Sequence, residues 1–257
     1  MPGNWLYEKS WDEVSEYLKK DDRIMIPVGS TEQHGRFAPL GTDTLLAIAL
    51  AEDASDRTGV LIAPPLWFGW SPHHLVRPGT ISIRAEILVE VLYDIIRSLA
   101  KHGFKKFVII NGHRIVNIPW LQIVAERSQR ELKVKVVIFD PAYMSKEIAD
   151  KLGFGPVGHA EEIETSHMLF KYPHLIKLNK AKDYVPKEKP LYYVDPRDPR
   201  DTLCYVPSTE EDMRSLIEAS GDSIVGRPTL SSPEKGKKYH EYLVSRLVEV
   251  LNMLKEG

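Results

Sequence analysis

The 257-residue sequence predicts an α/β fold in which helices cover both faces of a mainly parallel sheet. Two observations support this prediction. Short, continuously apolar runs are typical of strands that are buried on both faces, as the strands of a parallel sheet are. These runs alternate with amphipathic stretches long enough to be helices, and such alternation indicates βαβ units.

The first half of the chain contains clear start and stop signals for these elements. Ser10 and Glu13 form a capping box, which opens a helix. The first apolar run ends at Gly29, while Gly59 and Gly103 follow two helical patterns as stop residues. The elements expected up to residue 102 are helices at 10–20, 42–58 and 86–102, and strands at 23–28, 60–63 and 80–83.

The second half continues this alternation and then changes in composition. Pro, Lys, Asp and Tyr dominate residues 180–207, which we expect to form a long loop excursion. No Pro-, Gly- or Ser-rich linker precedes it, and we therefore expect a single domain over residues 1–257. The remaining elements are strands at 106–110 and 134–139, helices at 118–132 and 160–170, a helix restarting at a capping box in 208–211, and a final helix from 232 to about 254.

Charge and cysteine content exclude several classes of protein. The formal net charge is −2, which argues against a dedicated nucleic-acid binder, because such proteins need a basic surface. Cys204 is the single cysteine, so no intrachain disulfide can form. The sequence has no apolar stretch of membrane-spanning length and no signal-peptide pattern at its start. We therefore expect a cytoplasmic protein without a membrane or nucleic-acid partner.

Polar residues follow the predicted strands at the edge where parallel sheets bind ligands. Glu32 and His34 follow the first strand, and Asp43 lies further along the same loop. His113 follows the strand at 106–110, and the acidic segment 161–164 lies beyond the strand at 134–139. These nitrogen and oxygen donors suit Zn²⁺, Mn²⁺ or Fe²⁺, and the Asp43 carboxylate has two oxygens with which to bridge two ions.

Each of these residues also has a simpler interpretation. Asp43 can cap the helix that begins there, and the acids at 161–164 can be first-turn residues that favour the helix dipole. A single histidine beside a strand is more often hydrogen-bonded or exposed than a metal ligand. The convergence of all of them on one sheet edge favours the metal site. His102, His167, His174 and His240 lie in helical or helix-end contexts and are interpreted as structural.

Several segments, in order along the chain, together resemble the motifs of the creatininase (creatinine amidohydrolase) family. They are 27–35 (PVGSTEQHG) with 39–43 (PLGTD), 71–74 (SPHH) with 77–80 (RPGT), 111–113 (NGH), 159–166 (HAEEIETS, resembling HAGExETS), and 226–229 (GRPT) with 234–236 (EKG). The resemblance covers about residues 20–250.

This resemblance implies a three-layer α/β/α sandwich and a metal-dependent amide hydrolase with two divalent ions, which forms a homo-oligomer, commonly a hexamer. It implies that a small-molecule substrate is cleaved at a non-peptide C–N bond by metal-activated hydroxide. The implied metal ligands are Glu32, His34, Asp43 and His113, with Asp43 as the bridge. His159 matches the proton-transfer residue. Glu164 or Glu162 remains for a further ligand; we assign Glu164 as the ligand and Glu162 as catalytic.

The chain also departs from the family pattern. Creatininase proper has a glutamate ligand where this chain has Ile115, and it has a tryptophan lid that is missing before His159. Other branches have NGHGGN where this chain has Arg114 and Ile115 after His113. Creatinine is therefore a doubtful substrate. A formamide deformylase with a nucleotide-like substrate, as in riboflavin or deazaflavin synthesis, a peptidase-like branch, and a non-catalytic scaffold that has lost a metal remain alternatives.

Arginines in the loops at the predicted site suggest how a substrate is recognised. Arg36, Arg77 and Arg114 all lie in these loops, and we expect at least one to bind an anionic group of the substrate. Arg36, Arg114 and His74 are the predicted substrate-binding residues. The alternative for the arginines is a salt bridge to Glu161 or to another nearby acid.

Overall fold

The computed structural model describes residues 3–155, 158–186 and 206–256. Most of the excursion predicted at 180–207, including Cys204, lies outside the described residues. Among the helices that are described, none is both long and apolar enough to cross a membrane.

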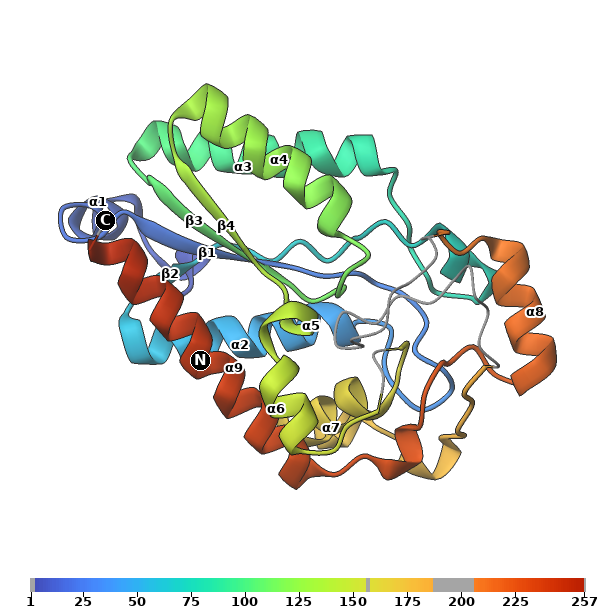
Figure 1. Ribbon diagram of the computed structural model, residues 1–257. Coiled ribbons are helices and arrows are strands. Elements are labelled where there is room, and N and C mark those ends of the chain that lie inside the picture. Colours follow the sequence, from blue (N-terminus) through green and yellow to red (C-terminus); the bar gives the residue numbers. More distant parts are fainter. Residues whose placement is uncertain (1–2, 156–157, 187–205, 257) are drawn as a thin grey trace.

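A parallel sheet forms the central layer (Figure 1). Its strands run in the order β2-β1-β3-β4, and each neighbouring pair is parallel. The predicted α/β class with a parallel sheet is therefore confirmed. The strands are β1 (Arg23–Val28), β2 (Leu61–Ile62), β3 (Lys106–Asn111) and β4 (Lys135–Phe139).

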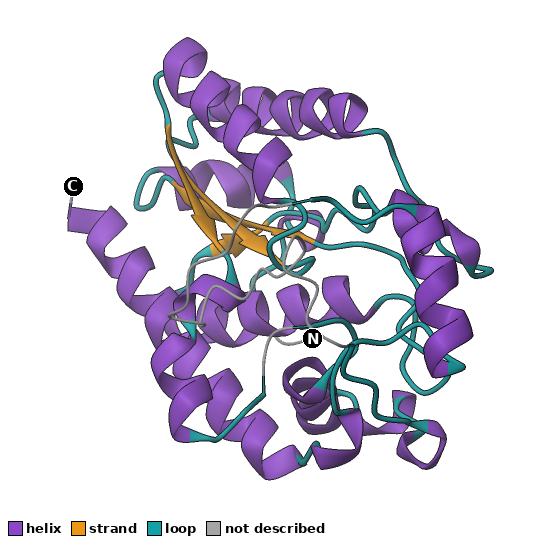
Figure 2. Ribbon diagram, turned by 45° about the vertical axis from the view of Figure 1, so that its right-hand side comes forward, coloured by secondary structure: helices purple, strands orange, loops and turns teal. Residues whose placement is uncertain are grey.

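Helices cover both faces of this sheet (Figure 2). On one side lie α3 (Ala85–His102) and α4 (Ile118–Leu132), and on the other lie α2 (Thr42–Thr58) and α9 (Pro233–Glu256) (Figure 1). The other α-helices described are α1 (Trp11–Leu18), α5 (Pro141–Met144), α6 (Lys146–Lys151), α7 (Glu162–Lys171) and α8 (Glu210–Ser220).

Alternation of side chains along β1 divides the core between these two faces. Ile24 and Ile26 belong to the apolar cluster formed with α3 and α4. Met25 belongs to the cluster formed with α2 and α9. All three side chains are fully buried, as expected for a strand that is covered on both faces.

The predicted helix boundaries agree closely with those of the structure. Ser10 and Glu13 form the predicted capping box before α1. Gly59 and Gly103 end α2 and α3 with φ angles of 72° and 118°, which are accessible to glycine at little cost. The restarting helix begins one residue later than predicted, because its capping box joins Thr209 to Asp212 rather than starting at residue 208.

The strand predicted at 80–83 is wrong. Its residues make isolated bridges to loops, Ile81 with Thr31 and Ser82 with Gly69, and do not join the sheet. The Ile81 side chain is 44% exposed, so the alternation in this segment does not reflect one buried face. The segment instead ties together the loops that follow β1 and β2.

Candidate metal centre

The candidate site lies at the carboxyl ends of β1 and β3, the sheet edge at which parallel α/β proteins bind ligands. Two glycines let the first turn of α2 approach this edge closely. A Cβ atom on Gly112 would lie 2.0 Å from the carbonyl oxygen of Asp43, and one on Gly29 would lie 2.5 Å from the backbone nitrogen of Thr44. Larger residues at these positions would therefore displace the turn that carries Asp43.

Asp43 lies between two histidines from different strand ends. Its Oδ1 is 3.1 Å from Nε2 of His34, and its Oδ2 is 3.0 Å from Nδ1 of His113. The side chain makes no capping bond, because Gly41 is the N-cap residue of α2. The simpler interpretation of Asp43 as a helix cap is thus wrong, and its carboxylate is free to face the site with one oxygen toward each ring.

Hydrogen bonding fixes the orientation of His34. Its Nδ1 is 3.1 Å from the carbonyl oxygen of Glu32, which can only accept, so Nδ1–H is the donor. Nε2 consequently points toward Asp43 and, at 3.8 Å, toward Glu164. A backbone carbonyl that sets the tautomer in this way is typical of metal-ligating histidines.

The charges of the acids dominate the protonation of these two rings. Burial alone lowers the pKa of His34, but Asp43, Glu164 and Glu32 outweigh it and raise the pKa to about 10. Burial also lowers the pKa of His113, and Glu32 and Asp43 raise it to about 9. Burial opposes ionisation of Asp43, but the two histidines hold its pKa well below the usual value.

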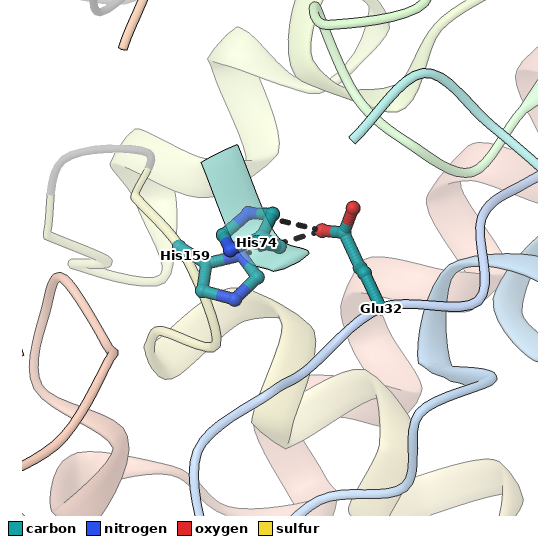
Figure 3. Close-up of side chains that lie close together, drawn as sticks. All are labelled: Glu32, His74 and His159. Atoms are coloured by element: carbon teal, nitrogen blue, oxygen red, sulfur yellow. Dashed lines mark ion pairs between the residues drawn. The ribbon is translucent and has the colours of Figure 1, made fainter. Parts of the chain in front are cut away.

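A second group of side chains surrounds Glu32 (Figure 3). Its Oε1 is 3.4 Å from Nε2 of His74 and 3.6 Å from Nδ1 of His159, while its Oε2 is 3.4 Å from Nε2 of His113. The rings of His74 and His159 stack with centroids 4.1 Å apart. Burial, followed by neighbouring histidines, lowers the pKa of both rings, so both are neutral at pH 7.

Gln33 organises these two neutral rings, and we did not anticipate this from the sequence. Its Nε2 donates to Nδ1 of His74 at 2.8 Å and to the carbonyl oxygen of Ser223 at 3.0 Å. The backbone carbonyl oxygen of Gln33 accepts from Nε2–H of His159 at 2.6 Å. Nδ1 of His159 therefore has a free lone pair, and it faces Glu32. Alternation along residues 32–34 places Gln33 on the side opposite Glu32 and His34, so the pattern contains no signal for this role.

The donor set fits divalent ions. Three groups bring ligand atoms within 4.8 Å of one another: Glu32 with Asp43 and His113, His34 with His159 and Glu164, and Glu32 with His74 and His159. Oε1 of Glu32 is buried and makes no hydrogen bond among the described residues, and it faces the lone pair of His159. Two electron-pair donors that face each other in a buried place are stabilised by a cation between them.

The acidic segment contributes differently from the prediction. Glu164 joins the cluster, but Glu162 does not: its carboxylate pairs with Nζ of Lys235 at 2.5 Å, on α9. Arg114 also differs from the prediction, because its guanidinium is buried against Glu161 and Glu164. The alternative expectation, a salt bridge to Glu161, is therefore what the structure contains. Arg36, by contrast, is exposed.

The structure is thus an α/β protein with a parallel sheet whose edge gathers carboxylates and imidazoles, the donor types that suit divalent metal ions. The chain belongs to the creatininase family, whose model, described as creatinine amidohydrolase, matches residues 7–251. It is a creatininase-like hydrolase.

Individual relatives agree with this assignment. The 3-dehydro-scyllo-inosose hydrolase of Thermotoga maritima is 30% identical over 99% of this chain and 84% of its own length. The creatinine amidohydrolase of Pseudomonas putida is 30% identical over 85% of this chain and 90% of its own. A solved mutant creatininase complexed with creatine superimposes with a TM-score of 0.81 and 27% identity, over 98% of both chains.

Proposed function

We propose that this chain is a metal-dependent amidohydrolase that cleaves a non-peptide C–N bond in a small cyclic amide or a formamide. One observation carries the proposal: Asp43 presents one oxygen to His34 and the other to His113, so that it can serve two ions at once. Glu32 and Glu164 supply further carboxylate oxygens on either side.

The residues that would hold two ions are those predicted from the sequence. Glu32, Asp43 and His113 would hold one ion, and His34, Asp43 and Glu164 the other. Zinc, manganese and iron all suit these donors, and related creatininase structures include a Zn–Zn type and a manganese form. When bound, such ions polarise a carbonyl group and activate water near neutral pH.

His159 is the proposed proton-transfer residue. It is neutral at pH 7, and Gln33 fixes its proton on Nε2, which leaves Nδ1 able to accept a proton. Because Nδ1 faces Glu32 at the centre of the site, a proton taken up there can be passed to the departing nitrogen.

The surroundings of the loop arginines indicate which of them can bind an anionic group of the substrate. Arg114 is already paired with two acids, so Arg36 and Arg77 remain for recognition of an anionic group, and Arg36 is exposed in the loop after β1. An anionic formamide, as in the nucleotide-like deformylase alternative, would depend on this residue. Arg36→Ala should then weaken turnover of anionic substrates and leave neutral ones unchanged.

Ion analysis and a substrate panel test the proposal together. We expect purified protein, stripped of ions and then reconstituted with zinc, manganese or iron, to hold about two equivalents per chain. It should hydrolyse at least one member of a panel of creatinine, formamides and lactams, and Asp43→Asn should abolish this activity. Protein that binds no ion and hydrolyses no member of the panel would instead be the non-catalytic scaffold.

The remaining expectations concern assembly and location. We propose a cytoplasmic homo-oligomer, as large as a hexamer. Exposed apolar side chains on α3 and α4, namely Ile87, Val91 and Ile123, favour self-association because such a surface is stabilised when it is covered. Light scattering coupled to gel filtration measures the mass, and a monomer at micromolar concentration would contradict the assembly.

A further inference from the structure

We propose that Arg114 is a positioning residue that holds one oxygen of Glu164 and leaves only the other for an ion. The inference rests on the proposed function, in which Glu164 is a ligand. Arg114 is a position at which this chain departs from the NGHGGN motif of other family branches. Its charged partner Glu161 is a second departure, because it stands where HAGExETS has glycine.

The contacts of Arg114 are numerous and buried. Its Nη2 is 2.7 Å from Oε1 of Glu164, and its Nε donates to the same oxygen at 3.1 Å. Nη2 also donates to both oxygens of Glu161, at 2.9 and 3.1 Å. The three side chains are only 6%, 8% and 2% exposed, so water competes little with these bonds.

The two oxygens of Glu164 consequently have separate tasks. Oε1 is taken by Arg114, whereas Oε2 accepts from the backbone nitrogen of Ala160 at 2.9 Å and lies 3.8 Å from Nε2 of His34. Ala160 has a φ of 52°, an unfavourable conformation for a residue other than glycine, and this bond helps to hold it. The carboxylate is thus fixed at both ends before any ion binds.

The backbone that carries Arg114 is also fixed. Ile115 has a φ of 67°, which is unusual for a β-branched residue. Its N–H donates to Oδ2 of Asp140 at 2.8 Å, and Asn111 donates to the same oxygen at 2.8 Å. Arg114 therefore joins two rigid segments, the loop after β3 and the start of α7, through Glu164.

Charge explains why the arginine is required. Without it, Glu161 and Glu164 would be two buried carboxylates with no cation between them, and like charges in a buried place repel strongly. Removing Arg114 would let the Glu164 carboxylate rotate, and its Oε2 would no longer be held in place for an ion. Glu32, Asp43 and His113 would hold the other ion, and among the described residues the hydrogen bonds and ion pairs of the Arg114 guanidinium go to Glu161 and Glu164 instead, so that ion should be unaffected.

Titration of the ion-free protein with Zn²⁺ in competition with a chromophoric chelator tests this inference. Wild type should bind two ions. Arg114→Met should bind one as wild type does and the other about 10–100-fold more weakly, the usual effect of losing a residue that orients a ligand. Arg127→Met is the matched control, because Arg127 also pairs with two glutamates but on the exposed surface of α4. Glu161→Gln leaves the contact with Glu164 intact and should retain both affinities.

The double variant Arg114→Met/Glu161→Gln removes one charge of each sign, and it serves as the test if Arg114→Met alone fails to fold. It should show the same weakened affinity for one ion. The inference would be overturned if folded Arg114→Met, or the double variant, bound both ions with wild-type affinity. It would also be overturned if Glu161→Gln lost affinity for one ion as much as Arg114→Met does. Wild-type protein that binds no ion would refute the proposed function instead, so the two failures are distinguishable.

Discussion

Gly112 offers a sharp test of how the sheet edge positions the candidate ligands. In Gly112→Ala the new Cβ atom would lie 2.0 Å from the carbonyl oxygen of Asp43, whereas real Cβ contacts are essentially never shorter than 3.0 Å. The first turn of α2 must therefore move by about 1 Å, the difference between these two distances. No side-chain rotation relieves the clash, because both atoms belong to the backbone or are fixed to it.

The displacement should affect both stability and the site. Overpacking of this kind costs about 1–3 kcal/mol in the free energy of unfolding. A shift of about 1 Å also breaks the contacts of Asp43 with His34 and His113, now 3.1 and 3.0 Å, and misplacement by that distance lowers turnover about 100-fold. Urea denaturation measures the first effect, and ion titration with a turnover assay measures the second.

Gly155→Ala is the matched control, because its new Cβ atom would meet no described atom within 4 Å and its φ is not left-handed. We expect the control to stay within about 0.5 kcal/mol of wild type. If Gly112→Ala were equally stable and bound ions as wild type does, the steric argument for the placement of α2 would be refuted.

Other perturbations test the core, the buried histidines and the ions. Leu243→Ala should lower the free energy of unfolding by about 2–5 kcal/mol in urea denaturation, since the side chain is fully buried under the sheet; a loss below 1 kcal/mol would contradict that packing. Burial lowers the pKa of His167 and of His240 below 6.5, so both rings are neutral when folded and bind protons more readily when unfolded. Stability should be full above pH 6.5 and fall as the pH is lowered, and His240→Asn should flatten this profile. Chelation should lower the melting temperature, because ions at 100 times their Kd stabilise by about 2.7 kcal/mol and their loss leaves Glu32 and Asp43 uncompensated; an unchanged melting temperature would argue against a resident ion.

The sequence could predict most of the fold because its signals are local. Periodicity placed α2 and α4 to the residue, with Gly59 as the stop signal of α2, and continuous apolar runs identified the four strands. The strand predicted at 80–83 fails for a physical reason: alternation shows that a segment can be extended, but not which backbone it will pair with. That partner, a loop at Thr31, is distant in the sequence.

The sequence predicts those residues of the candidate site that the strand ends bring together, but not the contacts that depend on packing between distant segments. Glu32, His34, Asp43 and His113 follow strands or begin the adjoining helix, so topology alone makes them converge. Glu162 and Glu164 are two residues apart on one helix, so their side chains lie roughly 200° apart around its axis. Which of them faces the site is decided by packing against α9, because Lys235 on that helix forms an ion pair with Glu162. A salt bridge from a loop arginine to Glu161 is an alternative that the sequence already offers, but only the folded loops show that Arg114, nearly fifty residues away, is the arginine that forms it.

The histidines show why position decides the role of a residue more than its type does. His167 and His240 face each other across α7 and α9, with His167 Nε2 2.7 Å from His240 Nδ1, and His240 Nε2 pairs with Asp53 at 2.7 Å. Their nitrogens face each other or one half-exposed acid, so the polar groups are satisfied within the helices. His34 and His113 instead direct nitrogens at shared, fully buried carboxylates at a sheet edge. A cation there would meet carboxylate oxygens and imidazole nitrogens from several segments, whereas the acid between the helices, Asp53, is already paired with Lys171 and His240.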